Sequence, residues 1–454
     1  MAGRYSGRGR GLEAAPTVDP NPWTRPVTSA ALLLIAFFSS GNFNDGIIPD
    51  SENSNFQQYI VIALWMAIAA VSYFRRQVLR IDPAAGLFVS LAPYALAVVS
   101  VGWSAVPAAS VPKAAALAIV VFSAFRLVKT MPLDAIVKAV IHGLFALCAL
   151  SIFLALFVPG VGLVTDYQHA GQWHGLFASK QTLGICGALL LFFASYRLML
   201  TPGLAYYWLA VAAAVACVAG SGSRGGGALA AAAVVGLYLA SVSTRVSRIL
   251  AYGPFLMCLT GCVLIAYFIL TGYKFIAVFD TEIDLTQRAI IWQYALGYFK
   301  NAPVLGYGLN GFWTLKEVKD LFIERNTWFL DNYHDGYIAI VMETGIVGLS
   351  LFAAGYFLYA RRISADIFRS GALDRGVTLT LVYTCLIFLI DFTETYFLRS
   401  TNIASTLLTI SLFVGFAQSG AFAPSAEGEA AGALEAQPRG VRHGRGPAPR
   451  FGAS

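Results

Sequence analysis

Charged residues are scarce in this sequence, and their scarcity excludes a soluble protein. Asp, Glu, Lys and Arg together make up 12% of its 454 residues, whereas a typical soluble domain carries about 25%. A chain of this length with so few charges could not cover its surface with polar groups. With 57% hydrophobic residues and a mean hydropathy of +0.67, the sequence predicts a membrane protein.

The sequence also lacks the weakly alternating segments of about ten residues that mark a membrane β-barrel. Apolar runs of helical span length recur instead along nearly the whole chain, since about 20 helical residues cross a bilayer. We therefore predict an all-α, polytopic membrane helix bundle of about twelve transmembrane helices. The predicted spans lie near residues 27–40, 58–74, 86–102, 113–127, 139–159, 183–196, 204–221, 225–242, 249–270, 335–360, 377–391 and 402–418.

Several catalytic motifs are missing. There is no GxxxxGK[ST] phosphate loop, no paired-aspartate DxD segment and no CxxC or HExxH metal motif. Nucleotide hydrolysis and metal catalysis therefore have no support, and we expect no metal and no cofactor. The six cysteines all fall inside predicted spans, so they indicate buried packing. No internal repeat is apparent, which weakens the case for a transporter built from two matching halves.

The basic residues are distributed unequally between the two sides of the predicted bundle. Most of the 31 lysines and arginines fall in the terminal segments and in the loops on the same side as the N-terminus, and such segments face the cytoplasm. With twelve spans, both termini are then cytoplasmic. The net charge of +7 thus indicates anchoring and orientation, with no nucleic acid partner. Residues 1–28 and 419–454 cannot form a core and are expected to be disordered, which leaves 29–418 as the membrane domain.

One outer loop, residues 271–334, is much longer than the others and indicates a functional element. Apolar residues recur at helical spacing in Thr286–Phe299 and in Phe312–Phe322, so we predict two amphipathic helices at the membrane surface. Between them, the run APVLGYGLNGFW predicts a tight turn around Gly308, whose exposed backbone amides are available to a ligand. A turn with no role beyond structure is the alternative.

Polar residues suited to chemistry gather on the same outer side. Arg224 stands in the hairpin SGSRGGG, where small neighbours leave backbone amides bare beside a cation, as an anionic phosphate requires. An arginine that only snorkels from a helix end is the alternative. Carboxylates near an apolar core are costly and usually face the bundle interior or a watery cavity. The other candidates are His174 and Lys180 in 160–182, Arg288 in the long loop, His334, Asp335 and Glu343 at the tenth span, and Asp391, Glu394 and Arg399 after the eleventh.

Arginines, a histidine and carboxylates on the side of the membrane that lacks ATP and nucleotide sugars suit a lipid carrying its own activated phosphate leaving group. Arginine binds a diphosphate through two hydrogen bonds and stays charged at any working pH. Stabilising the charge that grows on the departing diphosphate usually dominates such a transfer. A histidine or a carboxylate would accept the proton of an attacking sugar hydroxyl. The residues therefore predict glycosyl transfer in the outer leaflet.

Five runs follow one another in order around the long loop. They are WHGLFASKQTLG (173–184), SGSRGGGALA (221–230), DLTQRAIIWQYALGYFKNAPVLGYGLNGFW (284–313), HDGYIAIVMETGIVG (334–348) and DFTETYFL (391–398). Through these runs the chain resembles the O-antigen ligase and polymerase superfamily, most of all its ExoQ-type exopolysaccharide polymerases. The resemblance implies a GT-C-like glycosyltransferase of the bacterial inner membrane, with 271–334 as a periplasmic catalytic loop over a lipid-accessible cleft.

The resemblance also implies a donor and roles for single residues. The donor would be an undecaprenyl diphosphate-linked oligosaccharide, transferred without metal and with inversion to an acceptor hydroxyl. Arg224 and Arg288 match arginines associated with the diphosphate, and Lys180 lies in a matching run. His334 matches a histidine that activates or positions the acceptor, and Glu394 matches an acidic residue of the second-last outer loop; both are the catalytic candidates. The supporting candidates are His174, Asp335, Glu343 and Gly308.

One departure from the family pattern concerns Asp335, which stands where the family more often has Asn. Its carboxyl either supports His334 as a base or caps the helix that starts there.

Three activities remain open at this stage. The ExoQ-type runs favour a polymerase that joins lipid-linked repeat units. A ligase that transfers glycan to lipid A core or to a protein uses the same chemistry. A lipid-linked oligosaccharide flippase is the alternative from another class, although its polar residues should line both halves of the membrane. Membrane lipid is the expected surrounding, and a chain-length copolymerase is a candidate partner.

Overall fold

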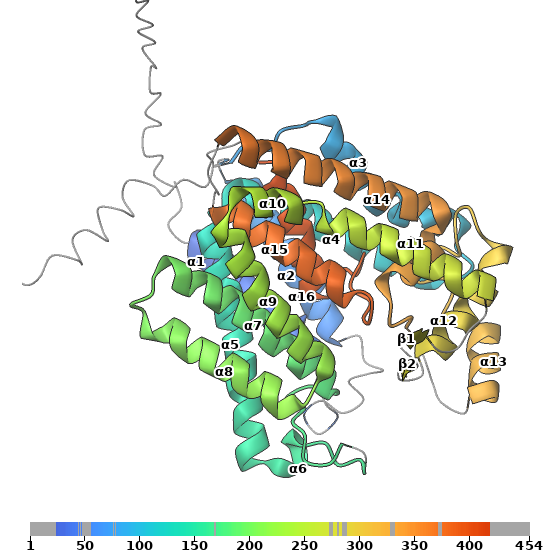
Figure 1. The fold of residues 1–454 in the computed structure, drawn as a ribbon, viewed down its shortest axis with the longest axis horizontal. Coiled ribbons are helices and arrows are strands. Elements are labelled where there is room, and N and C mark those ends of the chain that lie inside the picture. Colours follow the sequence, from blue (N-terminus) through green and yellow to red (C-terminus); the bar gives the residue numbers. More distant parts are fainter. Residues whose placement is uncertain are drawn as a thin grey trace, which may run out of the picture.

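The computed structural model describes residues 24–43, 45, 47, 56–75, 77, 79–167, 169–271, 276–278, 281–283, 288–326, 332–370 and 375–417. Within these ranges the chain is a bundle of helices with one small hairpin (Figure 1). The helices of the first half are α1 (Thr24–Phe38), α2 (Phe56–Tyr73), α3 (Ala85–Val99), η1 (Ser100–Trp103), α4 (Pro107–Thr130), α5 (Leu133–Phe157), α6 (Pro159–Gly162), α7 (Lys180–Leu200), α8 (Ala205–Ser221) and α9 (Arg224–Val242). The remaining elements are α10 (Thr244–Leu250), α11 (Gly253–Thr271), β1 (Ile276–Val278), β2 (Thr281–Ile283), α12 (Arg288–Gly297), η2 (Phe299–Asn301), α13 (Lys316–Asn326), α14 (Gly336–Ser370), α15 (Arg375–Ile390) and α16 (Ile403–Gly415).

The apolar runs of the sequence form the long helices, and the protein is a multi-pass membrane protein. Among the described residues, eight helical segments are long and apolar enough to cross a membrane, and four shorter apolar helices accompany them. Each of these helices falls on one of the predicted span positions. The prediction of a helical membrane bundle is therefore confirmed, while the hairpin of β1 and β2, which pair antiparallel, was not predicted.

Helix α7 forms the centre of the half of the bundle that carries the site. It packs against α5, α8 and α9, and 78% of the residues in its most apolar stretch are buried. Glycines set how closely its first turn meets α9. A Cβ atom at Gly226 would lie 2.6 Å from the carbonyl carbon of Gly184, so only glycine permits this approach. The close contact places the first residues of α7 and α9 side by side.

Helix α14 is interrupted near its N-terminal end, which the sequence did not predict. Gly345 has φ +67° and ψ −170°, a backbone conformation found almost exclusively at glycine. The turn at residues 303–308 of the long loop supplies the missing hydrogen bonds. Tyr307 N–H donates to the Met342 carbonyl at 2.8 Å, and Ile346 N–H donates to the Pro303 carbonyl at 2.9 Å. The loop backbone thus replaces the helical bonds that the break removes.

The two amphipathic helices predicted in the long loop correspond to α12 and α13, although α13 begins at Lys316, four residues after the predicted start. Aromatic side chains join them. The Trp313 ring packs against Phe322 of α13 and lies stacked 6.0 Å from the Tyr294 ring of α12. Figure 1 shows both helices and the hairpin together at one end of the bundle. Residues 272–275, 279–280, 284–287 and 327–331 of this loop lie outside the described ranges, as do residues 1–23 and 418–454. Residues 24–28, which were predicted to belong to a disordered N-terminal segment, form the start of α1 instead.

Candidate functional site

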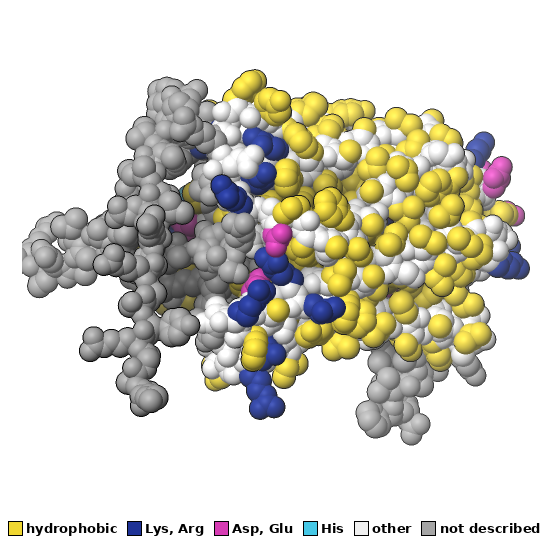
Figure 2. Space-filling view, turned by 90° about the horizontal axis from the view of Figure 1, so that it is seen from above, with side chains coloured by type: hydrophobic (Ala, Val, Ile, Leu, Met, Phe, Trp, Pro, Cys, Tyr) yellow, Lys and Arg dark blue, Asp and Glu magenta, His cyan; other side chains and the backbone are white. Residues whose placement is uncertain are grey.

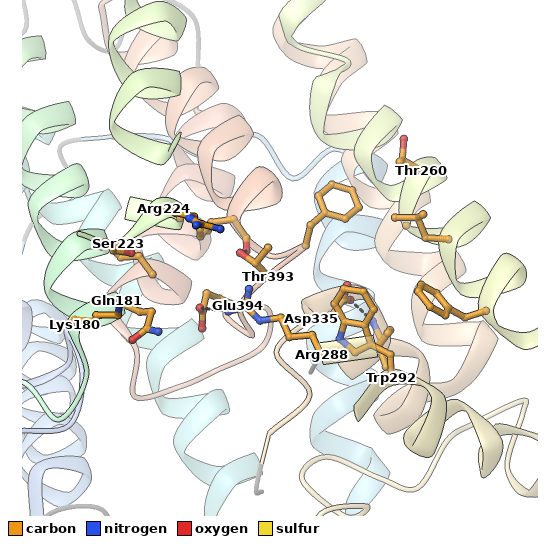
Figure 3. Close-up of a pocket in the computed structure, with 18 of the residues that line it drawn as sticks. Lys180, Gln181, Ser223, Arg224, Thr260, Arg288, Trp292, Asp335, Thr393 and Glu394 are labelled. Carbon is orange, nitrogen blue, oxygen red and sulfur yellow. Dashed lines mark hydrogen bonds and ion pairs between the residues drawn. The ribbon is translucent and has the colours of Figure 1, made fainter. Parts of the chain in front are cut away.

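A cavity of about 920 Å³ lies where α7, α9, α11, α12 and the start of α14 meet the turn that follows α15. In Figure 3 the labelled residues lie on two sides of the cavity and between them. Lys180, Gln181, Ser223 and Arg224 lie on one side, and Thr260 and Trp292 lie on the other, with Thr393, Glu394, Arg288 and Asp335 between them. The structure therefore brings together five of the residues that the sequence singled out: Lys180, Arg224, Arg288, Asp335 and Glu394.

Helices α7, α9 and α14 all begin at the cavity, and local sequence explains why they begin there. The Ser179 hydroxyl accepts a hydrogen bond from Thr182 N–H, and the Ser223 hydroxyl accepts one from Gly226 N–H. The Asp335 carboxylate accepts one from Ile338 N–H at 2.7 Å. Each is the N-cap arrangement that starts a helix. Because helix N-termini carry partial positive charge, the backbone itself makes this region favourable for an anion.

Cations reinforce that field at the first residues of two of these helices. Arg224 is exposed and makes no ion pair with any described residue. Lys180 donates to the side-chain oxygen of Gln172, an amide that leaves the ammonium charge uncompensated. Gly222, with φ +58°, turns the chain into Ser223 and lies against the same amide, since a Cβ there would be 3.0 Å from Gln172 Nε2. This side of the cavity therefore holds two cations without a neutralising carboxylate among the described residues.

The third cation of the cavity is paired. Arg288 Nη2 lies 3.1 Å from Glu394 Oε1, and the two side chains are 22% and 18% exposed. Glu394 Oε2 in turn lies 3.8 Å from His334 Nδ1, which has no hydrogen-bond partner among the described residues. Glu394 thus stands between an arginine and a histidine, and it is the member of the three with a neighbour on each side.

His334 is held in an unusual backbone conformation. Its φ is +49°, in the left-handed region that few non-glycine residues adopt. Its N–H donates to Asn332 Oδ1 at 2.7 Å, and the same oxygen accepts from the Thr395 hydroxyl at 3.1 Å. That hydroxyl also accepts from Asp335 N–H at 3.2 Å. Asn332 and Thr395 together fix His334 beside Glu394.

Two buried carboxyls anchor this corner. Asp391 Oδ1 accepts from Tyr396 N–H at 2.8 Å, and its main-chain carbonyl accepts from Gly336 N–H at 2.7 Å, which ties the turn carrying Glu394 to the start of α14. Burial raises the pKa of Asp391 well above its usual range. Burial also raises the pKa of Asp335 to about 8, against the lowering effect of its backbone hydrogen bonds and of Arg288. Asp335 therefore holds its proton more readily than an exposed carboxyl does.

The wall opposite Arg224 is apolar. It consists of Leu264, Ile265 and Phe268 of α11 with Trp292 of α12. Trp292 is fixed from both sides, because its Nε1–H donates to the Tyr333 carbonyl at 3.0 Å and its ring packs edge-on against Phe268. The cavity thus combines a cationic side with a hydrophobic side.

Some predicted residues lie elsewhere. His174 Nδ1 contacts the Phe177 carbonyl at 2.6 Å, Glu343 forms a buried ion pair with Arg399, and Gly308 packs against Ser104. None of these lines the cavity, and His334 borders it only through Glu394. Asp335 does cap α14, which is one of its two predicted roles.

Further polar residues line the cavity without having been among the candidate site residues, including His169, Gln172, Gln181, Thr260 and Thr393. His169 and Gln172 belong to the same outer segment as His174. The neighbouring Trp173 ring fills the space above Gly220.

Comparison with known proteins finds two similarities. Residues 209–353 match the family model described as O-antigen ligase. The predicted superfamily resemblance is confirmed. The segment of this chain that matches the family model contains Arg224, Arg288 and His334. Over 316 residues the chain is also 24% identical to the exopolysaccharide production protein ExoQ of Rhizobium meliloti (strain 1021), covering 66% of this chain and 70% of that protein.

Proposed function

We propose that this protein is a polysaccharide polymerase that transfers a polyprenyl diphosphate-linked glycan, such as one on undecaprenyl diphosphate, to a sugar hydroxyl of another lipid-linked repeat unit. The observation that carries the proposal is the cavity in which Arg224, Lys180 and Arg288 face an apolar wall. The similarity to ExoQ supports polymer formation. The eight long and four shorter apolar helices among the described residues are consistent with this proposal, in which twelve spans cross the inner membrane with both termini in the cytoplasm and the cavity at the periplasmic face.

The cationic side of the cavity binds the diphosphate. Arg224 and Lys180 are not engaged by carboxylates and stand at the starts of α9 and α7, where the helix dipoles add to their charge. As the bond between the anomeric carbon and the diphosphate oxygen breaks, negative charge grows on that oxygen. Groups already oriented toward it stabilise the transition state more than the ground state. Arg288 joins them when it leaves Glu394.

Glu394 and His334 handle the acceptor proton. The acceptor hydroxyl oxygen attacks the anomeric carbon from the face opposite the diphosphate, which inverts the configuration. Glu394 lines the cavity and takes the proton, and His334, whose Nδ1 lies 3.8 Å away, positions it and shares the charge. Because Arg288 also contacts Glu394, departure of Arg288 toward the diphosphate makes the carboxylate a stronger base. Donor binding and base activation are coupled in this way.

The apolar wall of α11 and α12 faces the lipid part of the donor. A polyprenyl chain has no polar group to satisfy, so side chains such as Ile265 and Phe268 suit it through contact area alone. Thr260 and Gly261 interrupt this wall and give the head of the lipid room to approach the arginines.

A ligase is the second candidate, because the matched family model is described as O-antigen ligase. Donor chemistry is the same in both, and the acceptor differs. Deletion of the gene separates them. Loss of all long chains supports the polymerase, whereas long chains that persist on the lipid diphosphate would support the ligase and overturn the polymerase.

Substitution of the cations tests the cavity itself. Arg224→Ala and Arg288→Ala should each abolish polymer formation, since a diphosphate loses a charge-assisted bond worth about 1.5–3 kcal/mol at the step where its charge is greatest. The assay is the length distribution of glycan in membranes with matched protein levels. Arg245→Ala is the control, because Arg245 is an exposed arginine outside the cavity. Chain lengths of wild-type distribution in either cavity variant would remove that residue from the site.

A further inference from the structure

A second polar pocket, of about 660 Å³, lies at the other end of the bundle. It is formed by the start of α3, by α10 and by the later part of α14, and three of its lining residues are Arg248, Arg361 and Arg362. Helix α14 starts at the cavity, and Arg361 follows Gly336 by 25 residues, which corresponds to about 37 Å of helix. This second pocket therefore faces the opposite membrane surface from the catalytic cavity.

The three arginines of this pocket differ in their partners. Arg362 is neutralised, with Nη1 2.8 Å from Asp82 Oδ2 and Nε 3.0 Å from Asp366 Oδ2. Arg248 is oriented without being neutralised. Its guanidinium carbon lies 4.6 Å from the centre of the Phe368 ring, and its Nε lies 3.4 Å from the Ser364 hydroxyl. Among the described residues neither Arg248 nor Arg361 pairs with a carboxylate.

Large apolar side chains border the two free cations. Ile249 follows Arg248 in the chain, and the Phe368 ring packs against the Arg248 guanidinium. The two apolar side chains are 64% and 68% exposed. Figure 2 shows dark blue side chains gathered toward one end of this face, at the edge of a broad apolar area. Cations beside exposed apolar surface fit a ligand that has an anionic head and hydrocarbon chains, and they fit a free anion less well because nothing then covers Ile249 and Phe368.

We propose that this pocket binds the phosphate of an anionic phospholipid from the leaflet opposite the catalytic cavity. Arg248 and Arg361 donate hydrogen bonds to the phosphate oxygens, and Ile249 and Phe368 contact the first part of the acyl chains. Tyr252 and Phe416 line the pocket beneath the head group. A lipid bound here joins α10 to the later part of α14, and α10 in turn packs against α9.

The test uses the full chain, purified in detergent and examined by native mass spectrometry with added phosphatidylglycerol or phosphatidylcholine. We expect retention of phosphatidylglycerol in preference to phosphatidylcholine. The double variant Arg248→Gln, Arg361→Gln should bind phosphatidylglycerol on the order of tenfold more weakly. Arg369→Gln is the matched control, because Arg369 lies on the same helix, is 67% exposed and does not line the pocket.

Three results would overturn the proposal. They are equal retention of the two lipids, unchanged phosphatidylglycerol binding in the double variant, and equal loss of binding in Arg369→Gln. Millimolar inorganic phosphate is added as a further arm, and displacement of the lipid by phosphate alone would assign the site to a free anion instead. If the double variant does not fold, Arg361→Gln alone is measured, since Arg361 is exposed and holds no described structural contact. No glycan substrate enters the assay, so its outcome does not depend on the proposed function.

Discussion

Two arginine–glutamate pairs connect the turn after α15 to the rest of the protein, and they differ in their number of hydrogen bonds and in the burial of the glutamate. Arg399 binds Glu343 through two hydrogen bonds of 2.9 and 3.0 Å, and the Glu343 side chain is 3% exposed. Arg288 holds Glu394 through one contact of 3.1 Å in the cavity wall, with both side chains partly exposed. The first pair is closed, whereas the second can exchange partners.

The difference teaches that an ion pair must be judged by what else each partner can reach. Glu343 has no neighbour in the cavity, so breaking its pair would only leave a buried charge. Glu394 has His334 on its other side, and Arg288 has the cavity before it. A pair with a single bond and open neighbours can separate during a reaction without unfolding anything, which the buried pair cannot do.

The largest effect is expected from breaking the buried pair. Arg399→Ala leaves Glu343 ionised and buried, and the loss of one partner of a buried pair costs about 3–5 kcal/mol. We expect a lowered unfolding temperature and reduced amounts of protein in the membrane, with activity falling in proportion. Arg288→Ala is the comparison and should change the unfolding temperature little. Similar destabilisation by both substitutions would show that the two pairs are equivalent.

Glu394→Gln tests the exchangeable pair from its other partner. The amide keeps the size of the side chain, removes the base and frees Arg288. We expect turnover to fall on the order of 10²-fold, with a KM for the lipid-linked donor that stays the same or decreases because Arg288 is then available. Steady-state kinetics with purified protein separates the two parameters. A raised KM with unchanged turnover would contradict the role of Glu394 as base.

Replacement of each arginine by lysine gives a smaller and more selective effect. Arg399→Lys loses one of two charge-assisted hydrogen bonds and should cost about 1.5–3 kcal/mol. Arg288→Lys retains the single contact of a partly exposed pair and should change stability by less than about 1 kcal/mol. The change in stability is measured by thermal unfolding of the two variants in the same detergent. A larger loss of stability in Arg288→Lys than in Arg399→Lys would show that the burial of Glu343 does not determine how much its ion pair contributes to stability.

The pH dependence of stability should distinguish the cavity from the buried pair. Asp335 has a folded-state pKa of about 8 and an ordinary value of 3.8. Between these two values the folded protein binds more protons than the unfolded chain, so the free energy of unfolding falls as pH rises and levels off above about pH 8. Asp335→Asn keeps an oxygen for the helix cap and should remove this part of the slope.

Arg288→Ala sharpens the same measurement. Arg288 lowers the pKa of Asp335, so its removal should extend the falling region to higher pH. Unfolding midpoints are measured from pH 5 to 9 in wild type and both variants. An unchanged slope in Asp335→Asn would assign the pH dependence to another group.

The sequence predicted much of this architecture because its strongest signals are physical necessities. A bilayer demands long apolar helices, so the positions of spans such as α5 and α7 followed directly from hydropathy. The rarity of charge made Arg224, Arg288 and Glu394 conspicuous, and the fold places all three at one cavity. Scarcity of a residue type is informative where its presence is costly.

The partners of those residues were not predictable, because they depend on packing across long stretches of chain. Glu343 and Glu394 are both carboxylates that the sequence placed on the same side of the predicted bundle, and only the fold shows that one faces Arg399 and the other Arg288. The break at Gly345 was hidden for the same reason. Its sequence, ETGIVG, is compatible with a continuous apolar helix until the backbone of residues 303–308 is placed beside it.

The break in α14 also has a consequence for how the protein is made. In a bilayer, an unpaired backbone amide or carbonyl costs several kcal/mol, and here the pairing groups come from residues about 40 positions earlier in the chain. The segment around Gly345 therefore cannot settle in the bilayer alone. The loop before it must fold against it before these groups can pair, which makes α14 a late-maturing helix. The order in which the ribosome delivers these segments, loop first and helix second, is the order that such assembly requires.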